Sequence, residues 1–195
     1  MPDPLPFITY TFVMSITPGP NNVMLTASGA HFGFRRTLPH MLGIVFGFVV
    51  QLLAVCAGLS ALFARWPQLQ SVLAWVGAAY LVYLGWRMLR AQDSAAREAH
   101  RPVSFLEAAA FQFLNPKAWV MTLTAATLFL PQELAWLGRG LYMAGIAEGI
   151  GLPCMAVWAL FGSSLRGLLA APRGRRVFNA AMALALASTA FMMVR

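Results

Sequence analysis

Six long apolar runs follow one another along this chain and limit it to one broad class of fold. They cover residues 5–30, 38–64, 69–86, 108–130, 141–165 and 177–194. A helix needs roughly 20 apolar residues to cross a bilayer core of about 30 Å, and each run has that length or nearly so. Charged residues make up only 10% of the chain, so the surplus apolar surface has to face lipid. The sequence predicts an all-α membrane protein with six transmembrane helices.

Basic residues lie in the short connections between these runs, which argues against a nucleic-acid-binding protein despite the net charge of +8. Ten arginines fall in the first, third and fifth connections, and three fall elsewhere outside the runs. Cytoplasmic connections are rich in Lys and Arg. We therefore expect these three connections in the cytoplasm and both termini on the periplasmic side. The ten are Arg35, Arg36, Arg87, Arg90, Arg97, Arg101, Arg166, Arg173, Arg175 and Arg176.

The first apolar run is interrupted by Thr17-Pro18-Gly19-Pro20-Asn21-Asn22. Proline removes an amide donor and clashes with the preceding helical turn. Backbone freed at membrane depth has to be buried in protein or line a watery cavity. We expect a half-helix to start after Pro18, with its amides and positive dipole end suited to an anionic group such as an amino-acid carboxylate. The alternative is a simple proline kink, in which the asparagines only satisfy the backbone.

A second break, Asn115-Pro116-Lys117, divides the fourth run. It leaves residues 103–114 as a short interfacial or re-entrant helix. Broken helices at corresponding positions of two halves indicate the binding site of a transporter. Lys117 is the single lysine of the chain. It either belongs to that site or extends to the membrane surface.

The hydrophilic stretch 91–101 divides the runs into two sets of three. We interpret it as a cytoplasmic linker between halves 1–90 and 102–195 of one transmembrane transporter domain. Three spans per half force the second half to insert upside down, which is the 3+3 inverted repeat of many transporters. A shift of 98 residues sets Thr17-Pro18 on Asn115-Pro116, the breaks in helices 1 and 4.

A few polar residues inside the runs are candidates for chemistry. Glu148 is the one acid well inside a run, and it is a candidate proton carrier or partner for a substrate ammonium. The alternatives are an ion pair with Lys117 or an inert acid near a helix end. Gln51 is expected to face the bundle, in the site or in an interhelical hydrogen bond. His31 and His40 bracket the first basic connection and are interpreted as solvated.

Catalysis and bound metals are not expected. Two cysteines, Cys56 and Cys154, provide neither a disulfide framework nor enough ligands for a structural zinc. No carboxylate pair, His/Glu metal spacing or nucleophile elbow is present in the sequence. We expect a transporter without a cofactor rather than an enzyme.

Five motifs in order resemble the LysE/RhtB superfamily of amino-acid exporters. They are Ile16-Thr17-Pro18-Gly19-Pro20-Asn21-Asn22, Gly33-Phe34-Arg35, Gly43-Ile44-Val45-Phe46-Gly47, the residues 77–87, and Phe113-Leu114-Asn115-Pro116-Lys117-Ala118. The resemblance covers nearly the whole chain. It implies an inner-membrane exporter that moves amino acids or their derivatives outward, driven by the proton motive force, as an antiporter. The oligomeric state stays open, a homodimer included.

Three further motifs look like the branch that exports cysteine and O-acetylserine: Thr9-Tyr10-Thr11, Gln112-Phe113-Leu114-Asn115 and Phe129-Leu130-Pro131-Gln132. Many family members carry an Asp and a His where this chain has Phe48 and Gln51. Either Glu148 takes over the coupling role, or the substrates are zwitterions, which we favour. Exporters of homoserine, threonine or leucine are close alternatives, and a non-transporting membrane scaffold is another. The expected substrate-binding residues are Thr17, Pro18, Gly19, Pro20, Asn21, Asn22, Gln51, Asn115, Pro116 and Lys117, with Glu148 for proton coupling.

Overall fold

The computed structural model describes residues 3–90, 101–131 and 134–194, and all regular structure in these ranges is helical. The predicted helical class is confirmed. The elements are α1 (Leu5–Ile16), α2 (Pro20–Phe32), α3 (Phe34–Ala54), η1 (Val55–Leu59), α4 (Ser60–Arg65), α5 (Gln68–Arg90), α7 (Phe105–Leu114), α8 (Pro116–Leu128), α9 (Trp136–Ser164), η2 (Leu165–Leu169) and α10 (Pro172–Met193).

Among the described residues, four helical segments are long and apolar enough to cross a membrane, and α1 and α7 are shorter apolar helices. The four are Phe34–Leu59, Gln68–Arg90, Trp136–Leu169 and Pro172–Met193. Their outward faces expose large apolar side chains, among them Trp75, Phe161 and Leu184. Exposed apolar surface on this scale suits lipid rather than water. The chain is a multi-pass membrane protein.

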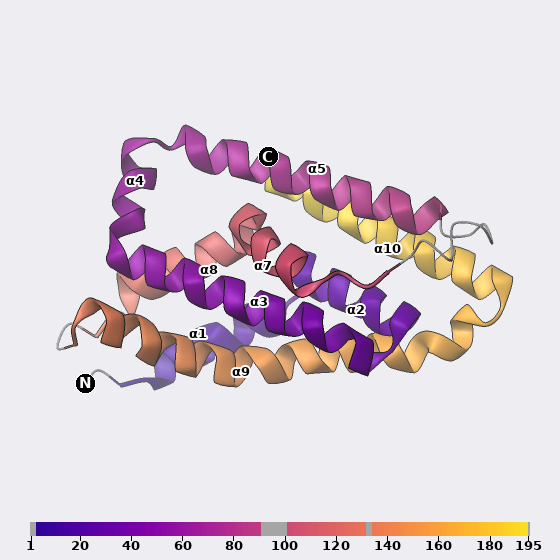
Figure 1. Cartoon of the computed structure of the whole chain (residues 1–195), viewed down its shortest axis with the longest axis horizontal. Helices are drawn as coiled ribbons and strands as arrows, with labels where there is room; N and C mark the ends of the chain where they lie inside the picture. The colour runs from indigo at the N-terminus through magenta and orange to yellow at the C-terminus, as the bar shows by residue number, and fades with distance from the viewer. Residues whose placement is uncertain (1–2, 91–100, 132–133, 195) are drawn as a thin grey trace.

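The long helices run along the longest axis of the molecule, and the chain turns at its two ends (Figure 1). One end holds the turn between α2 and α3, the end of α5, and η2 with the start of α10. The N-terminus and the starts of α5 and α9 lie toward the other end. The arginines that the structure describes in these connections therefore lie toward the first end.

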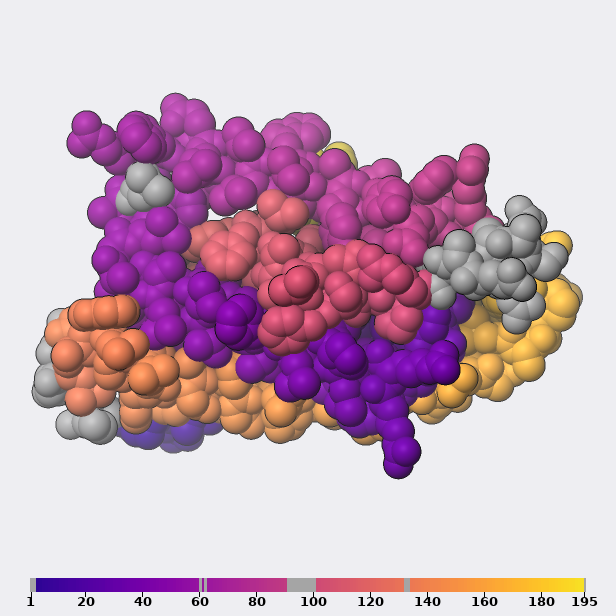
Figure 2. Space-filling model, viewed as in Figure 1, coloured from indigo at the N-terminus to yellow at the C-terminus, as the bar shows by residue number. Residues whose placement is uncertain are grey.

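Each broken segment packs along one unbroken helix. Both α1 and α2 contact α9, both α7 and α8 contact α3, and α5 pairs with α10. Figure 2 shows α7 seated between α3 and α5. Glycines bring the backbones close, because a Cβ on Gly29 would collide with the Ala159 carbonyl and a Cβ on Gly162 with the Thr26 carbonyl.

The second apolar run does not form one continuous, uniform helix over residues 38–64. Helix α3 begins directly after Gly33, whose φ of +84° favours glycine, so the predicted first connection is almost entirely helical. At the far end, Gly58 has a φ of +110° inside η1 and bends the chain into α4. The short helix predicted at 103–114 is confirmed as α7. Most of the predicted linker, residues 91–100, lies outside the described residues.

The interpretation of His31 and His40 as solvated is wrong. His40 is fully buried in α3, because the helix starts six residues before it and packs this turn against α7. His31 lies half-buried in the last turn of α2, with its Nε2 2.9 Å from Asn179 Oδ1 of α10.

Candidate functional site

Both breaks open onto one cavity that is partly open to the outside. Side chains from α1, α2, α3, α7, α8 and α9 surround it. They are Met14, Ser15, Gly19, Pro20, Asn21, Asn22, Ile44, Phe48, Gln112, Asn115, Lys117, Ala118, Met121, Ala147, Glu148, Gly151 and Met155. Two segments about a hundred residues apart therefore meet at one site.

The first break ends α1 at Ile16 and starts α2 at Pro20, with Gly19 in an extended conformation between them. The predicted half-helix is confirmed, and no side chain caps its first turn. Amides of a first helical turn have no partner within the helix, so they are available to a ligand. The side-chain amide of Asn22 donates to the carbonyls of Ser15 (2.9 Å) and Thr17 (2.8 Å). Asn22 thus satisfies the backbone of α1. This is the role that the simple proline kink, the alternative interpretation of the first break, gives to the asparagines.

Lys117 joins the second break to the first. Its ammonium donates to the Thr17 carbonyl (2.9 Å), the Thr17 hydroxyl (2.9 Å) and the Pro18 carbonyl (3.3 Å). A cation at the carboxyl end of α1 complements the negative end of that helix dipole. Extension of Lys117 to the membrane surface is therefore wrong. Gly19 leaves room for this contact, because a Cβ there would lie 2.9 Å from Lys117 Cδ.

Three amide side chains form a cluster beside the cavity. Asn21 Nδ2 donates to Gln112 Oε1 (3.3 Å), and Gln51 Nε2 donates to the Gln112 carbonyl (3.3 Å). Asn21 Oδ1, Gln112 Nε2 and Gln51 Oε1 are buried without a hydrogen-bond partner in the described part of the chain. Such groups cost free energy until a partner is supplied. Gln51 does not line the cavity itself and contacts it through Gln112.

Glu148 projects from α9 toward the end of α1. A Cβ on Gly151 would lie 3.7 Å from both Glu148 Oε2 and Ser15 Oγ, so the carboxylate and the hydroxyl flank one point on the cavity wall. Within residues 3–90, 101–131 and 134–194, the recorded ion pair is Arg101–Glu107, and none joins Glu148 to Lys117. The predicted alternative of a Lys117–Glu148 pair is therefore wrong for this conformation.

The remaining expected site residues have supporting positions. Thr17 and Pro18 hold Lys117, and Pro116 occupies the first turn of α8 without lining the cavity. Asn115 lines the cavity and caps α8, because its Oδ1 accepts the Lys117 amide at 3.1 Å. Across the described ranges, no group of three or more His, Cys, Asp or Glu residues is placed to hold a metal.

Sequence reasoning did not include Gln112, Ser15 or the methionines of the wall in the site. Gln112 lies three residues before Asn115 on the broken segment, which is the signal that could have found it. Met14, Met121 and the other methionine of the wall offer an adaptable apolar surface for a small side chain.

Comparison with known proteins adds an independent observation. Residues 12–195 match the family described as LysE type translocator. The cysteine/O-acetylserine efflux protein of Klebsiella pneumoniae subsp. pneumoniae is 33% identical over 177 residues, which cover 85% of this chain and 90% of that protein. The protein of the same name from Escherichia coli (strain K12) is 34% identical over 160 residues, which cover 80% of each chain. No solved structure matches this chain.

Proposed function

The chain belongs to the LysE-type translocator family, and we propose that it exports small neutral amino acids or their derivatives, with cysteine and O-acetylserine as the first candidates. It is a transporter rather than an enzyme. The observation that supports this proposal most directly is that both helix breaks meet at one cavity. That cavity holds the uncapped N-terminus of α2 and the carboxylate of Glu148.

The proposed topology has six passes through the inner membrane, built as a 3+3 inverted repeat. The segments α1–α2 and α7–α8 are then the broken helices 1 and 4. The packing supports this assignment, because exchanging the two halves turns the contacts of α1 and α2 with α9 into those of α7 and α8 with α3. The pairing of α5 with α10 is unchanged by the exchange. The arginine-rich end is cytoplasmic in this topology, and both termini are periplasmic.

We assign the substrate carboxylate to the amino end of α2. Its first-turn amides and positive dipole end favour an anion, and Gly19 and Pro20 hold them at the cavity. The substrate ammonium then faces Glu148, and Asn21 with Gln112 offers donors and acceptors to a polar side chain. A zwitterion fits this pairing of one helix end with one acid better than a lysine-like cation does.

Glu148 is also the proposed proton carrier. A carboxylate at membrane depth is expensive unless it is neutralised. A proton and a substrate ammonium both neutralise it, and each excludes the other. Export of an amino acid in exchange for an entering proton follows from that competition.

A panel assay in everted membrane vesicles tests the proposal, with cysteine, O-acetylserine, homoserine, threonine and leucine as labelled substrates. We expect saturable uptake of cysteine and O-acetylserine that stops when the proton gradient is collapsed. Stronger uptake of homoserine, threonine or leucine would favour the alternative exporters, and uptake of none would contradict the proposal. A scaffold, unlike an exporter, would tolerate replacement of Pro18 and Asn21. Size-exclusion chromatography with light scattering tests the homodimer.

A further inference from the structure

A second cavity of about 560 Å³ lies at the arginine-rich end of the molecule. It is bounded by the last turns of α2, the end of α5, the start of α7 and the middle of α10. Its charged and aromatic lining consists of His31, Phe32, Tyr80, Arg87, Arg101 and Glu107. None of these residues takes part in the site between the helix breaks.

The charges of this cavity do not cancel. Arg101 and Glu107 form a two-point ion pair, with Nη1–Oε2 and Nη2–Oε1 distances of 2.7 and 2.8 Å. Arg87 is half-buried on the same wall, and no acidic partner for it is found in the described ranges. Its Cζ lies 5.7 Å from the centroid of the Tyr83 ring. A guanidinium presents a planar fork that suits a carboxylate, so the cavity is equipped for a carboxylate-bearing ligand.

Hydrogen bonds of the Asn179 side chain hold the wall around Arg87 in place. Asn179 of α10 is fully buried and donates to the Met88 carbonyl at 2.9 Å, directly after Arg87 on α5. The Oδ1 of the same Asn179 lies 2.9 Å from His31 Nε2, at hydrogen-bond distance. The side chain of Asn179 therefore connects α2, α5 and α10 at this cavity.

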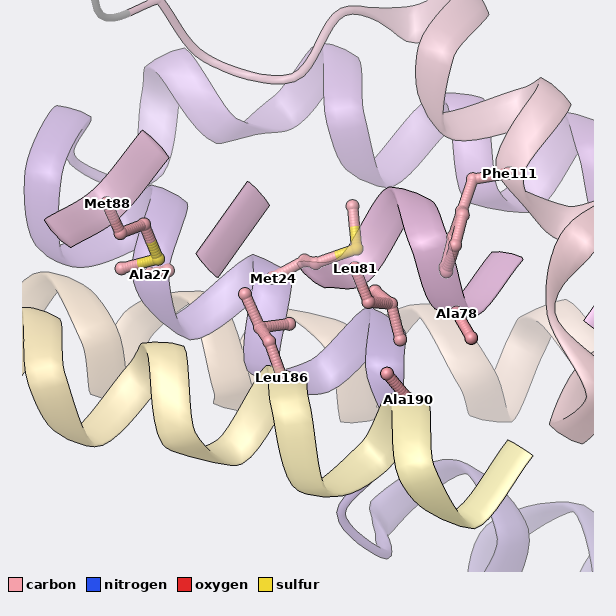
Figure 3. Close-up of a cluster of buried hydrophobic side chains, with 8 residues drawn as sticks. All are labelled: Met24, Ala27, Ala78, Leu81, Met88, Phe111, Leu186 and Ala190. Atoms are coloured by element: carbon pink, nitrogen blue, oxygen red, sulfur yellow. The ribbon is translucent and has the colours of Figure 1, made fainter. Parts of the chain in front are cut away.

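An apolar cluster forms part of the wall of the second cavity, and its members Leu81 and Phe111 line neither cavity. Along α2, Asn21 and Asn22 line the first cavity, and Met24, Ala27 and Ser28 line the second. Figure 3 shows Met24, Leu81, Phe111 and Leu186 in one cluster of buried apolar side chains. Leu81 is fully buried and Phe111 is 2% exposed, directly before Gln112 of the first site. A polar solute cannot pass this layer unless its side chains move apart.

We propose that the second cavity is a loading site for the exported amino acid on the cytoplasmic side of this apolar layer. Arg87 binds the substrate carboxylate, and Glu107 of the Arg101 pair lies within the same cavity to accept the substrate ammonium. The apolar layer then separates loading from the central site. This inference rests on the proposed function.

The matched pair Arg87→Gln and Arg90→Gln tests it. Arg90 lies on the next turn of α5, is exposed, and stacks over Trp86 with Cζ 4.4 Å from the ring centroid. Both substitutions remove one positive charge from the same end of the molecule. Initial rates of labelled cysteine uptake, with reductant present, are measured in everted vesicles, in which the cytoplasmic face points outward.

We expect Arg87→Gln to raise KM for cysteine about tenfold with the maximal rate within about twofold, since one charge-assisted carboxylate contact is removed. Arg90→Gln should leave KM unchanged. Arg87→Lys keeps the charge without the planar fork, and its KM should be intermediate. Rates are normalised to folded protein in the vesicles, so a variant that inserts poorly is still informative.

An unchanged KM in Arg87→Gln, or an equal rise in both glutamine variants, would overturn the loading site while leaving the proposed export intact. A wild-type protein that moves none of the panel of amino acids would overturn the proposed function, and this inference with it.

Discussion

The two helix breaks share a topology and differ in chemistry. At the first, α2 starts without a side-chain cap, and its amides face the cavity. At the second, Asn115 caps α8, and Lys117 extends to the carboxyl end of α1. One break therefore keeps a free anion-binding helix end, whereas the other has its first turn satisfied and supplies a cation to its counterpart.

If the two halves form the proposed inverted repeat, this difference explains how such a repeat can have one polar site rather than two. The residues at each break then decide what that break does. Lys117 and Gly19 occupy equivalent positions after a shift of 98 residues, and they contact each other across the site. The missing side chain of one creates the space for the side chain of the other. We expect ligand binding to depend on the first break and stability to depend on the second.

The largest effect is expected from Gly19→Asp, which would give α2 the cap it lacks. The extended backbone at Gly19 accepts any residue, so the aspartate side chain can bind the free amides itself. It then competes with the substrate carboxylate, and export should fall about a hundredfold, equivalent to about 2.7 kcal/mol of binding. Vesicle uptake measures this loss.

Gly19→Ala is the matched control, because its Cβ meets Lys117 in the same way without adding a carboxylate. We expect it to lower export only a few-fold. Equal losses in the two variants would mean that crowding of Lys117, rather than occupation of the helix end, explains the effect.

Lys117→Met should chiefly lower stability, because it leaves the carbonyls of Thr17 and Pro18 without their donor. The expected loss in the free energy of unfolding is about 1–3 kcal/mol. Unfolding in mixed-detergent titrations provides the measurement. Thr17→Val removes one of the three acceptors and should have a smaller effect. Full stability of Lys117→Met would show that the link between the breaks is dispensable.

Asn115→Ala tests the second break alone. Loss of an N-cap side chain should lower the free energy of unfolding by about 1 kcal/mol. Asn115→Ser, which retains an acceptor oxygen, should restore most of it. Export per folded molecule should stay within about twofold of wild type in both variants, given that this helix end is already satisfied. A deep loss of export with normal stability would place Asn115 in substrate binding instead.

The smallest effect is expected at the start of α7, where the capping box ties Glu107 to Ser104 ahead of the apolar run 108–130. Partial burial opposes ionisation of Glu107, but hydrogen bonds from Arg101 and Ser104 outweigh it and lower the pKa to about 2. The unfolded chain therefore binds this proton at higher pH than the folded chain. The stabilisation is full above the unfolded pKa of 4.5, and it is lost as pH falls toward 2.

Thermal unfolding of wild type and Glu107→Gln between pH 7 and pH 3 measures this contribution. The difference between the two proteins should shrink as pH falls below about 4.5. Because both partners are partly solvated, high salt should reduce it as well. A difference that stays constant with pH would mean that the carboxylate charge contributes nothing.

Much of the fold follows from local sequence. Apolar runs predicted the long helices, and Pro18 with Pro20 predicted the break between α1 and α2, because both signals act within a few residues. His40 was misplaced because its burial depends on α7, a segment distant in the chain. The bend at Gly58 was not predicted either, since a single glycine in an apolar run does not reveal its backbone angles.

The candidate site was predicted in location and only partly in detail. The prolines and asparagines of the two breaks marked its position. The partners of Lys117 and the contact between Asn21 and Gln112 depend on how the two halves pack, and no local pattern specifies that. From sequence alone, Lys117 either belongs to the site or extends to the membrane surface. The distances from its Nζ to Thr17 and Pro18 distinguish the two interpretations.

Exchange of an amino acid for a proton through Glu148 is the central claim, and proton movement in proteoliposomes tests it most directly. An imposed cysteine gradient should drive proton flux in the opposite direction through the wild-type protein. In Glu148→Gln that flux should vanish, because the neutral amide carries no proton and offers the substrate ammonium no charged partner. Proton flux at the wild-type rate in correctly inserted Glu148→Gln would contradict the account.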